Sequence, residues 1–272
     1  SVTELKKTWG FEKREGGGIV ITRYKGNRAE VEVPEKIGKE TVKEIGERAF
    51  SPHALRLTEE QKQFRKQITK VTLPETVEFI REGAFYDCEK LYSINLPEGV
   101  KSIGASAFCG CNNLPEISIP LSVNEIGLGA FVGCQSLISV DLPEGLTEIS
   151  GGCFSGCKLL KNITIPPTVR KIGKWAFLRC FAVEEITVPE GVEEIGEKVF
   201  ADCPELKSVT LPKSLKSVKN YKRKGWELDT VFSGSEKVTV TVSIKSYAER
   251  YCKRNNIPYI TSENETGKKE ND

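Results

Sequence analysis

The sequence contains no methionine, one histidine and almost no excess charge. Without methionine two origins stay open, because Ser1 follows either a removed initiator or a longer leader, and these imply different compartments. Forty Lys and Arg residues against 38 Asp and Glu residues leave a net charge of +2. So weak an overall field does not favour a nucleic-acid or anionic-membrane partner. We therefore expect no nucleic-acid partner.

Long apolar runs are also missing from this chain. No stretch reaches the roughly 18 apolar residues of a membrane helix, and the first residues, SVTELKKTWGFEKREGGG, lack the apolar centre of a signal peptide. We expect no membrane span. A hydrophobic fraction of 38% and a charged fraction of 29% still fit a soluble, folded protein.

The sequence instead contains a strict repeat of 23 residues. Self-similarity at a fixed period of this size is typical of solenoid proteins. Proline, isoleucine, phenylalanine and cysteine all keep the spacing: Pro74, Pro97, Pro120, Pro143, Pro166, Pro189 and Pro212; Ile80, Ile103, Ile126, Ile149, Ile172 and Ile195; Phe85, Phe108, Phe131, Phe154, Phe177 and Phe200; Cys88, Cys111, Cys134, Cys157, Cys180 and Cys203.

Each repeat reads L-x-x-I-x-L-P-x-x-V-x-x-I-G-x-x-A-F-x-x-C, and each part indicates a local structure. Polar and apolar residues alternate over 93–96, as in a half-buried strand, and the following proline ends that strand. Gly104 is interpreted as permitting a tight bend. Ala107, Phe108 and Cys111 have the spacing of a helical turn. One repeat is therefore expected to form one coil of a stack.

A single coil buries too few apolar side chains to offset the conformational entropy of ordering 23 residues. Stacked coils gain strand hydrogen bonds and cover each other's apolar edges, so the two ends of the stack need caps. The fold class predicted from the repeat is a solenoid of about eight coils with short parallel β-strands and short helical turns.

The repeat resembles the BspA-like leucine-rich repeat of bacterial proteins, through the I-x-L-P-x-x-V-x-x-I-G-x-x-A-F-x-x-C signature over about residues 29–218. The departures are mild: Ser150 and Arg81 replace the glycine, and Cys153 and Val199 replace the alanine. The resemblance implies a right-handed leucine-rich repeat superhelix. It also implies surface-associated proteins that act in adhesion and in host or cell contact.

The chain divides into four predicted segments. Residues 1–28 are expected to form an N-terminal hairpin cap, and 29–218 the repeat array. A helical insertion is expected at about 52–67, where Thr58 and Gln61 have capping-box spacing. Residues 219–262 are expected to form a C-terminal cap with a helix and a last strand, and 263–272 a disordered tail.

Nine cysteines raise the question of disulfide or metal chemistry. Six keep the repeat position, where a small, largely apolar side chain fills the core. Neighbouring thiols would lie about 4.8 Å apart along the stack, but their Cα–Cβ bonds point in the same direction, so free thiols are predicted. Zinc needs four converging ligands, whereas the pairs Cys109/Cys111 and Cys153/Cys157 supply two each. No metal and no cofactor are expected.

A histidine and a basic run each have a functional and a structural explanation. His53 lies three residues after Phe50, in register with the cysteines, and a His53–Cys88 dyad is the sharpest enzymatic hypothesis. No orienting Asp or Asn is identifiable and Cys88 is expected to be buried, so we predict that the chain is not an enzyme. The basic run 213–226 could hold phosphates or an acidic partner, but a solvated loop is favoured.

The expected strands also present outward-facing columns of small polar side chains, which would form the concave surface of a leucine-rich repeat protein. Such a surface can bind a protein or a glycan, although a threonine column also arises from β-propensity alone. Large aromatic anchors are missing apart from Tyr92. The predicted binding residues are Ser93, Asn95, Glu116, Ser118, Ser139, Asp141, Asn162, Thr164, Glu185 and Thr187.

These observations predict a non-catalytic, monomeric binding module with a protein or carbohydrate ligand, and the family resemblance implies that it is secreted or at the cell surface. An intracellular scaffold or regulatory protein in the cytoplasm is the alternative, because oxidising compartments normally pair thiols. A repeat scaffold supports many ligands, so the partner itself is not determined by the pattern.

Overall fold

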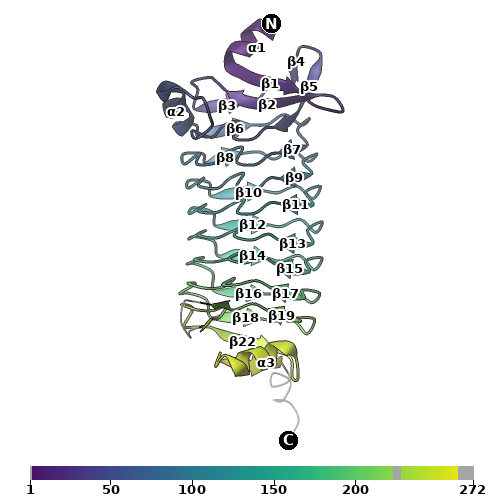
Figure 1. The fold of residues 1–272 in the computed structure, drawn as a ribbon, viewed down its shortest axis with the longest axis vertical. Coiled ribbons are helices and arrows are strands. Elements are labelled where there is room, and N and C mark those ends of the chain that lie inside the picture. The colour runs from purple at the N-terminus through teal and green to yellow at the C-terminus, as the bar shows by residue number, and fades with distance from the viewer. Residues whose placement is uncertain (1, 223–227, 263–272) are drawn as a thin grey trace, which may run out of the picture.

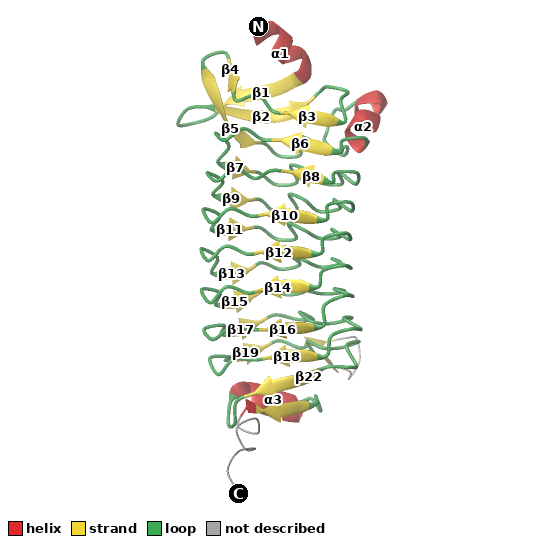
Figure 2. Cartoon of the chain, turned by 180° about the vertical axis from the view of Figure 1, so that it is seen from behind, coloured by secondary structure: helices red, strands yellow, loops and turns green. Residues whose placement is uncertain are grey.

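The coils of the chain pile into one straight stack (Figures 1 and 2). This computed structural model describes residues 2–222 and 228–262. The predicted tail, 263–272, lies outside the described residues. Two columns of short strands run along the stack, and three α-helices lie at or near its ends within the described part of the chain: α1 (Val2–Thr8), α2 (Glu59–Lys66) and α3 (Tyr247–Arg254).

The first column contains the strands predicted before each proline. Most consecutive strands pair in parallel with a shift of one repeat, as in Ile117 opposite Val140 and Val140 opposite Ile163. Its members are β3 (Glu30–Glu32), β6 (Lys70–Thr72), β8 (Ser93–Ile94), β10 (Glu116–Ser118), β12 (Ser139–Asp141), β14 (Asn162–Thr164), β16 (Glu185–Thr187), β18 (Ser208–Thr210), β22 (Thr239–Val242) and β23 (Tyr259–Thr261).

The second column lies where the V-x-x-I part of each repeat falls. Ile80, Ile103 and Ile126 pair successively in parallel register. The members are β2 (Ile19–Tyr24), β5 (Glu40–Ile45), β7 (Phe79–Ile80), β9 (Ser102–Ile103), β11 (Glu125–Ile126), β13 (Glu148–Ile149), β15 (Lys171–Ile172), β17 (Glu194–Ile195) and β19 (Ser217–Val218). The same pairing repeats from coil to coil except between β11 and β13, which belong to different hydrogen-bonded sheets.

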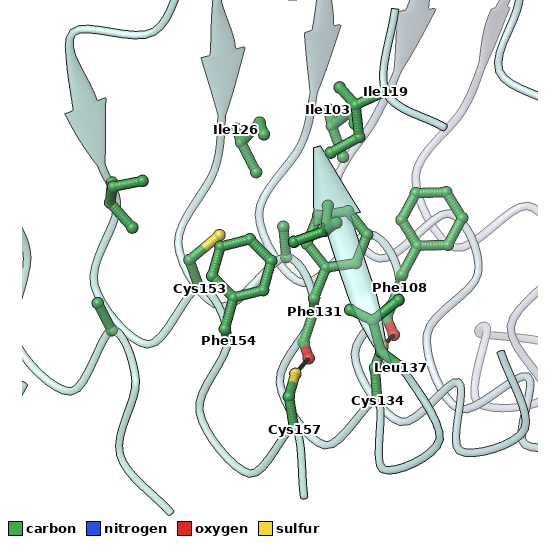
Figure 3. Packing of buried hydrophobic residues seen from close by; sticks show 14 of the residues in the cluster. Ile103, Phe108, Ile119, Ile126, Phe131, Cys134, Leu137, Cys153, Phe154 and Cys157 are labelled. Carbon is green, nitrogen blue, oxygen red and sulfur yellow. Dashed lines mark hydrogen bonds between the residues drawn. The ribbon is translucent and has the colours of Figure 1, made fainter. Parts of the chain in front are cut away.

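The core is a column of stacked phenylalanine rings. Phe108, Phe131 and Phe154 have ring centroids 5.4 and 5.5 Å apart and nearly parallel planes (Figure 3). Each phenylalanine is fully buried. The segment around it is a single hydrogen-bonded turn, in which the N–H of Cys111 donates to the carbonyl of Phe108 at 3.1 Å. The repeat therefore contributes one aromatic layer per coil to a continuous core.

The glycine that follows the isoleucine in the repeat has a different role from the one expected. Gly104 is not among the residues with positive φ. A Cβ atom there would lie 2.6 Å from the backbone carbon of Arg81 and from the nitrogen of Glu82 in the preceding coil. Gly104 is needed because two backbones approach closely, and not because the chain bends tightly.

The N-terminal end is closed by an antiparallel hairpin of β1 (Trp9–Lys13) and β2. Tyr24 stacks on Phe50 at 5.6 Å, and Trp9 packs edge-on against the same ring at 6.1 Å. Helix α1 and a second hairpin, β4 (Lys36–Ile37) with β5, were not predicted. Helix α1 contacts β1 and β4 contacts β5, so both are local additions that the repeat pattern does not include.

Helix α2 is the predicted helical insertion. Thr58 and Gln61 form the capping box that the sequence indicates. Arg65 is almost completely buried and donates to the carbonyls of Tyr24 at 2.6 Å and Ser51 at 2.7 Å. This guanidinium anchors the insertion to the N-terminal cap, since a buried charge needs such hydrogen bonds.

At the C-terminal end β18 pairs with β22, and β22 with β23, so the first column continues beyond residue 218. Phe232 stacks on Phe200 at 5.6 Å and continues the aromatic core. Helix α3 covers this end with buried Ala248, Tyr251 and Cys252. A short antiparallel pair, β20 (Tyr221–Lys222) with β21 (Leu228–Asp229), branches off the stack. In the described residues no helix is long and apolar enough to cross a membrane.

A polar strand face as the candidate binding site

The outward-facing side chains of the first strand column, from β3 to β18, form one surface, which we call the strand face. Successive strand residues point to opposite sides, so Glu116 and Ser118 are exposed while Ile117 between them is buried. The parallel register then places like positions above each other from coil to coil. The fold therefore forms a polar surface from the strand positions at which the repeat specifies no residue type.

The sequence-predicted binding residues all lie on this strand face. Ser93 is half-buried, and the others are exposed: Asn95, Glu116, Ser118, Ser139, Asp141, Asn162, Thr164, Glu185 and Thr187. Ion pairs between neighbouring coils flank them, as between Lys207 and Glu184 at 2.6 Å. Figure 1 shows the strands that carry these residues stacked in one column.

Asn95 has a structural role in addition to its exposure. Its Oδ1 accepts from the N–H of Leu73 at 2.7 Å, and its Nδ2 donates to the carbonyl of Leu73 at 2.9 Å. The side-chain amide thus satisfies both backbone groups of a residue in the preceding coil, as a strand partner would. The next two strands of the column, β8 and β10, belong to different hydrogen-bonded sheets, so the column is interrupted between them.

The strand column is interrupted a second time, between β14 and β16. These strands belong to different hydrogen-bonded sheets, although their Cα atoms lie within 8 Å. A hollow of about 620 Å³ lies over the interruption. The hollow is lined by four of the predicted residues, Asn162, Thr164, Glu185 and Thr187. The repeat pattern gives no signal for it, because the two coils match the consensus as well as their neighbours do.

A further hollow of about 550 Å³ lies between the N-terminal cap and the first strands of the face. Trp9 and Tyr24 of the hairpin, Arg28, and Lys70 of β6 are among the residues around it. Sequence reasoning missed this hollow, since its walls come together only when the cap docks on the array.

All nine cysteines are free, and eight of them are buried. Burial raises the pKa of Cys88 to about 12, and burial together with the Asp87 carboxylate raises that of Cys109 to about 11. Thiolate, the nucleophilic and metal-binding form, is therefore disfavoured. Within residues 2–222 and 228–262, no cluster of three or more His, Cys, Asp or Glu side chains could hold a metal ion.

The His53–Cys88 dyad is not formed. His53 Nε2 lies 3.2 Å from Oδ2 of Asp87, an acidic partner that the sequence did not reveal. The Cys88 thiol instead donates to the carbonyl of Phe50 at 3.5 Å. Asp87 itself has a pKa raised by burial, against the opposing effect of His53. His53 is therefore in contact with the Asp87 carboxylate, and the Cys88 thiol bonds to a backbone carbonyl and not to His53.

The basic run is partly described. Lys216 pairs with Glu193 at 2.8 Å, and the ammonium of Lys198 lies 4.5 Å from the centre of the Tyr221 ring. Arg223, Lys224 and Trp226 lie outside the described residues. The solvated-loop interpretation and the phosphate-binding interpretation both stay predictions.

Comparison with known proteins agrees with the repeat. A family profile described as the BspA type leucine rich repeat region matches in six copies over residues 30–134, 60–180 and 124–256. A crystal structure of a T. pallidum leucine-rich repeat protein is 31% identical, covers 74% of this chain and 88% of that one, and has a TM-score of 0.66. Among curated proteins no sequence matches the chain.

Two other crystal structures share the fold. A leucine-rich repeat protein from Bacteroides ovatus is 26% identical over 86% of this chain and 70% of that chain, with a TM-score of 0.53. A protein described as a leucine rich cell surface protein from Faecalibacterium prausnitzii is 21% identical over 94% and 93%, with a TM-score of 0.54, which supports the fold alone. The chain belongs to the BspA-type leucine-rich repeat family.

Proposed function

We propose that this protein is a non-catalytic binding module, which recognises a protein or carbohydrate partner through its strand face. The observation that carries the proposal is the alignment of exposed polar side chains in register along the stack, with hollows at two places. Repeat solenoids commonly use such extended surfaces for binding. The buried thiols, with their raised pKa values, lend no support to nucleophilic chemistry.

The setting that we propose is adhesion or host and cell contact at a bacterial cell surface. An intracellular scaffold is the alternative, and nine unpaired cysteines favour it. Burial weakens that argument, because a fully buried thiol is protected from oxidation in either compartment. Recovery of the gene start and localisation of the protein in its native host would decide between the two.

A charge reversal on the strand face tests the binding proposal. The double variant Asp141→Lys/Glu185→Lys changes two exposed residues of β12 and β16. The matched control, Glu125→Lys/Glu194→Lys, makes the same change in charge at exposed residues of the second strand column. Binding partners are sought on a glycan array and by purification of bound proteins from host extracts.

We expect the strand-face variant to lose at least about tenfold in affinity for the partner found, which corresponds to about 1.4 kcal/mol, and the control to retain it. Circular dichroism and thermal melting verify that both variants stay folded. Unaltered binding in the strand-face variant, or equal loss in both variants, would contradict the proposal.

A further inference from the structure

The interruption between β14 and β16 is the one over which the hollow of the strand face lies. In the coils before it, β10, β12 and β14 form one hydrogen-bonded sheet, and in the coils after it β16, β18, β22 and β23 form another. Ile163, at the centre of β14, is half-buried, whereas Val140 and Ile186 at the same position are only 3% and 2% exposed. The interruption therefore uncovers apolar surface that the neighbouring coils keep closed.

The chemistry around this opening is mixed. Asn162 supplies both a donor and an acceptor, Thr164 and Thr187 supply hydroxyl groups, and Glu185 accepts. Ala182 and Pro189 add small apolar patches beside Ile163. A ligand that satisfies this lining must carry donors and acceptors close together on a compact framework with some apolar C–H surface. The volume of about 620 Å³ lies in the usual range for small-molecule sites.

The charges near the opening balance. Lys161 and Lys207 carry positive charge, and Glu184 and Glu185 negative charge. Glu184 is already paired with Lys207 at 2.6 Å. No excess of one sign is left to attract an anionic or a cationic ligand, so a neutral ligand that forms many hydrogen bonds is favoured.

An extended peptide does not fit between the strands. A strand inserted between two others would hold them about 9.6 Å apart, twice the spacing of paired strands. The Cα atoms of β14 and β16 lie within 8 Å. The space between β14 and β16 is thus too narrow for a peptide strand to pair with both. The hollow on the exposed side of the two strands can still hold the ring of a small molecule.

We propose that the hollow over β14 and β16 is a subsite for an uncharged sugar ring of a glycan. Glu185 and Asn162 hold its hydroxyl groups, and the uncovered edge of Ile163 contacts its C–H surface. The inference rests on the proposed binding function and deepens it, by naming the ligand class and the coils that hold it.

The test uses the full chain on an array of immobilised neutral and anionic oligosaccharides, followed by calorimetric titration of the neutral oligosaccharide with the strongest signal. Glu185→Gln keeps the size of the side chain and removes its charge. The matched control is Glu125→Gln, which makes the same change at an exposed glutamate of β11 in the second strand column, away from the strand face. Asn162→Ala tests the second hydrogen-bonding residue.

We expect wild-type protein to bind neutral glycans, Glu185→Gln and Asn162→Ala to weaken binding at least about tenfold, and Glu125→Gln to change it less than about twofold. Equal loss in Glu185→Gln and Glu125→Gln would show that the loss does not arise at the hollow and would overturn the subsite. Binding confined to anionic glycans would also overturn it.

The outcomes separate this inference from the binding function on which it rests. If no glycan binds, while a protein partner binds and is lost in Asp141→Lys/Glu185→Lys, the sugar subsite fails and the proposed function stands. If glycan binding is unchanged in all of these variants, both fail. If the chain binds neither glycan nor protein, both fail as well.

Discussion

The thiol of Cys134 donates a hydrogen bond to the backbone carbonyl of Phe108, 26 residues earlier, at 3.2 Å (Figure 3). Four other cysteines of the repeat make the same bond at the same distance to the phenylalanine in the same relative position: Cys111, Cys157, Cys180 and Cys203. In the last coil Ser235 takes this role and donates to the carbonyl of Phe200 at 2.7 Å. The repeated cysteine is thus a small core residue that also satisfies a buried carbonyl.

Replacement of Cys134 by alanine is expected to destabilise the protein by about 1–3 kcal/mol, because the Phe108 carbonyl loses its partner. Cys134→Ser should retain more stability than Cys134→Ala, since the hydroxyl can donate as that of Ser235 does. Cys153→Ala is the control, because Cys153 occupies the alanine position of other coils and is also fully buried. Urea midpoints and melting temperatures measure the effect, and equal losses in the two alanine variants would argue against the hydrogen bond.

The cysteines should be nearly inert in the folded protein. At pH 8 we expect less than one equivalent of thiol to react with a chromogenic disulfide reagent before unfolding, and all nine to react in denaturant. Cys109 should react first, because it is the one half-exposed cysteine, even though its pKa is raised to about 11. Rapid reaction of several thiols in the native state would show that the coils open or that the core is not packed as described.

Acid should weaken the contact between the first coils. Glu78 bonds to Lys101 and Lys43 on either side, both at 2.7 Å, and these bonds lower its pKa from 4.5 to about 2. A lowered pKa in the folded state stabilises the protein above about pH 4.5, and this contribution is lost as the pH falls from 4.5 towards 2. The melting temperatures of wild type and Glu78→Gln should therefore differ at pH 7 and converge near pH 2.

The matched control for this titration is Glu125→Gln, which removes an exposed carboxylate from the same strand column. It should melt close to wild type across the range. A difference between wild type and Glu78→Gln that stays constant down to pH 2 would mean that the glutamine variant is destabilised for reasons other than the ion pairs.

Glycines of the repeat should respond to alanine according to their surroundings. At Gly127 a Cβ atom would lie 2.4 Å from the backbone nitrogen of Ala105, so Gly127→Ala should cost about 3 kcal/mol. At Gly133 the nearest atom is 4.0 Å away but φ is +69°, so Gly133→Ala should cost only the left-handed strain of about 1 kcal/mol. Chemical denaturation of both variants measures the order, and a greater cost at Gly133 would contradict the close backbone approach.

The repeat pattern alone predicts the coil and its stacking, because a period of 23 residues allows the same phenylalanine, isoleucine and cysteine to meet their copies in the next coil. The polar strand face followed from the same pattern, since alternate strand residues must point away from a core that takes the others. The capping box at Thr58 was also predictable, because it depends on residues three apart.

Other features were decided by contacts between segments far apart in the chain. The hollow between the N-terminal cap and β6 depends on how the cap docks on the array. The contact of His53 with Asp87 depends on the stacking of two coils, which no local pattern records. The spatial reason for Gly104 required the preceding coil to be in place. The opening between β14 and β16 is likewise a tertiary property, because the repeat pattern does not record whether consecutive strands come close enough to pair.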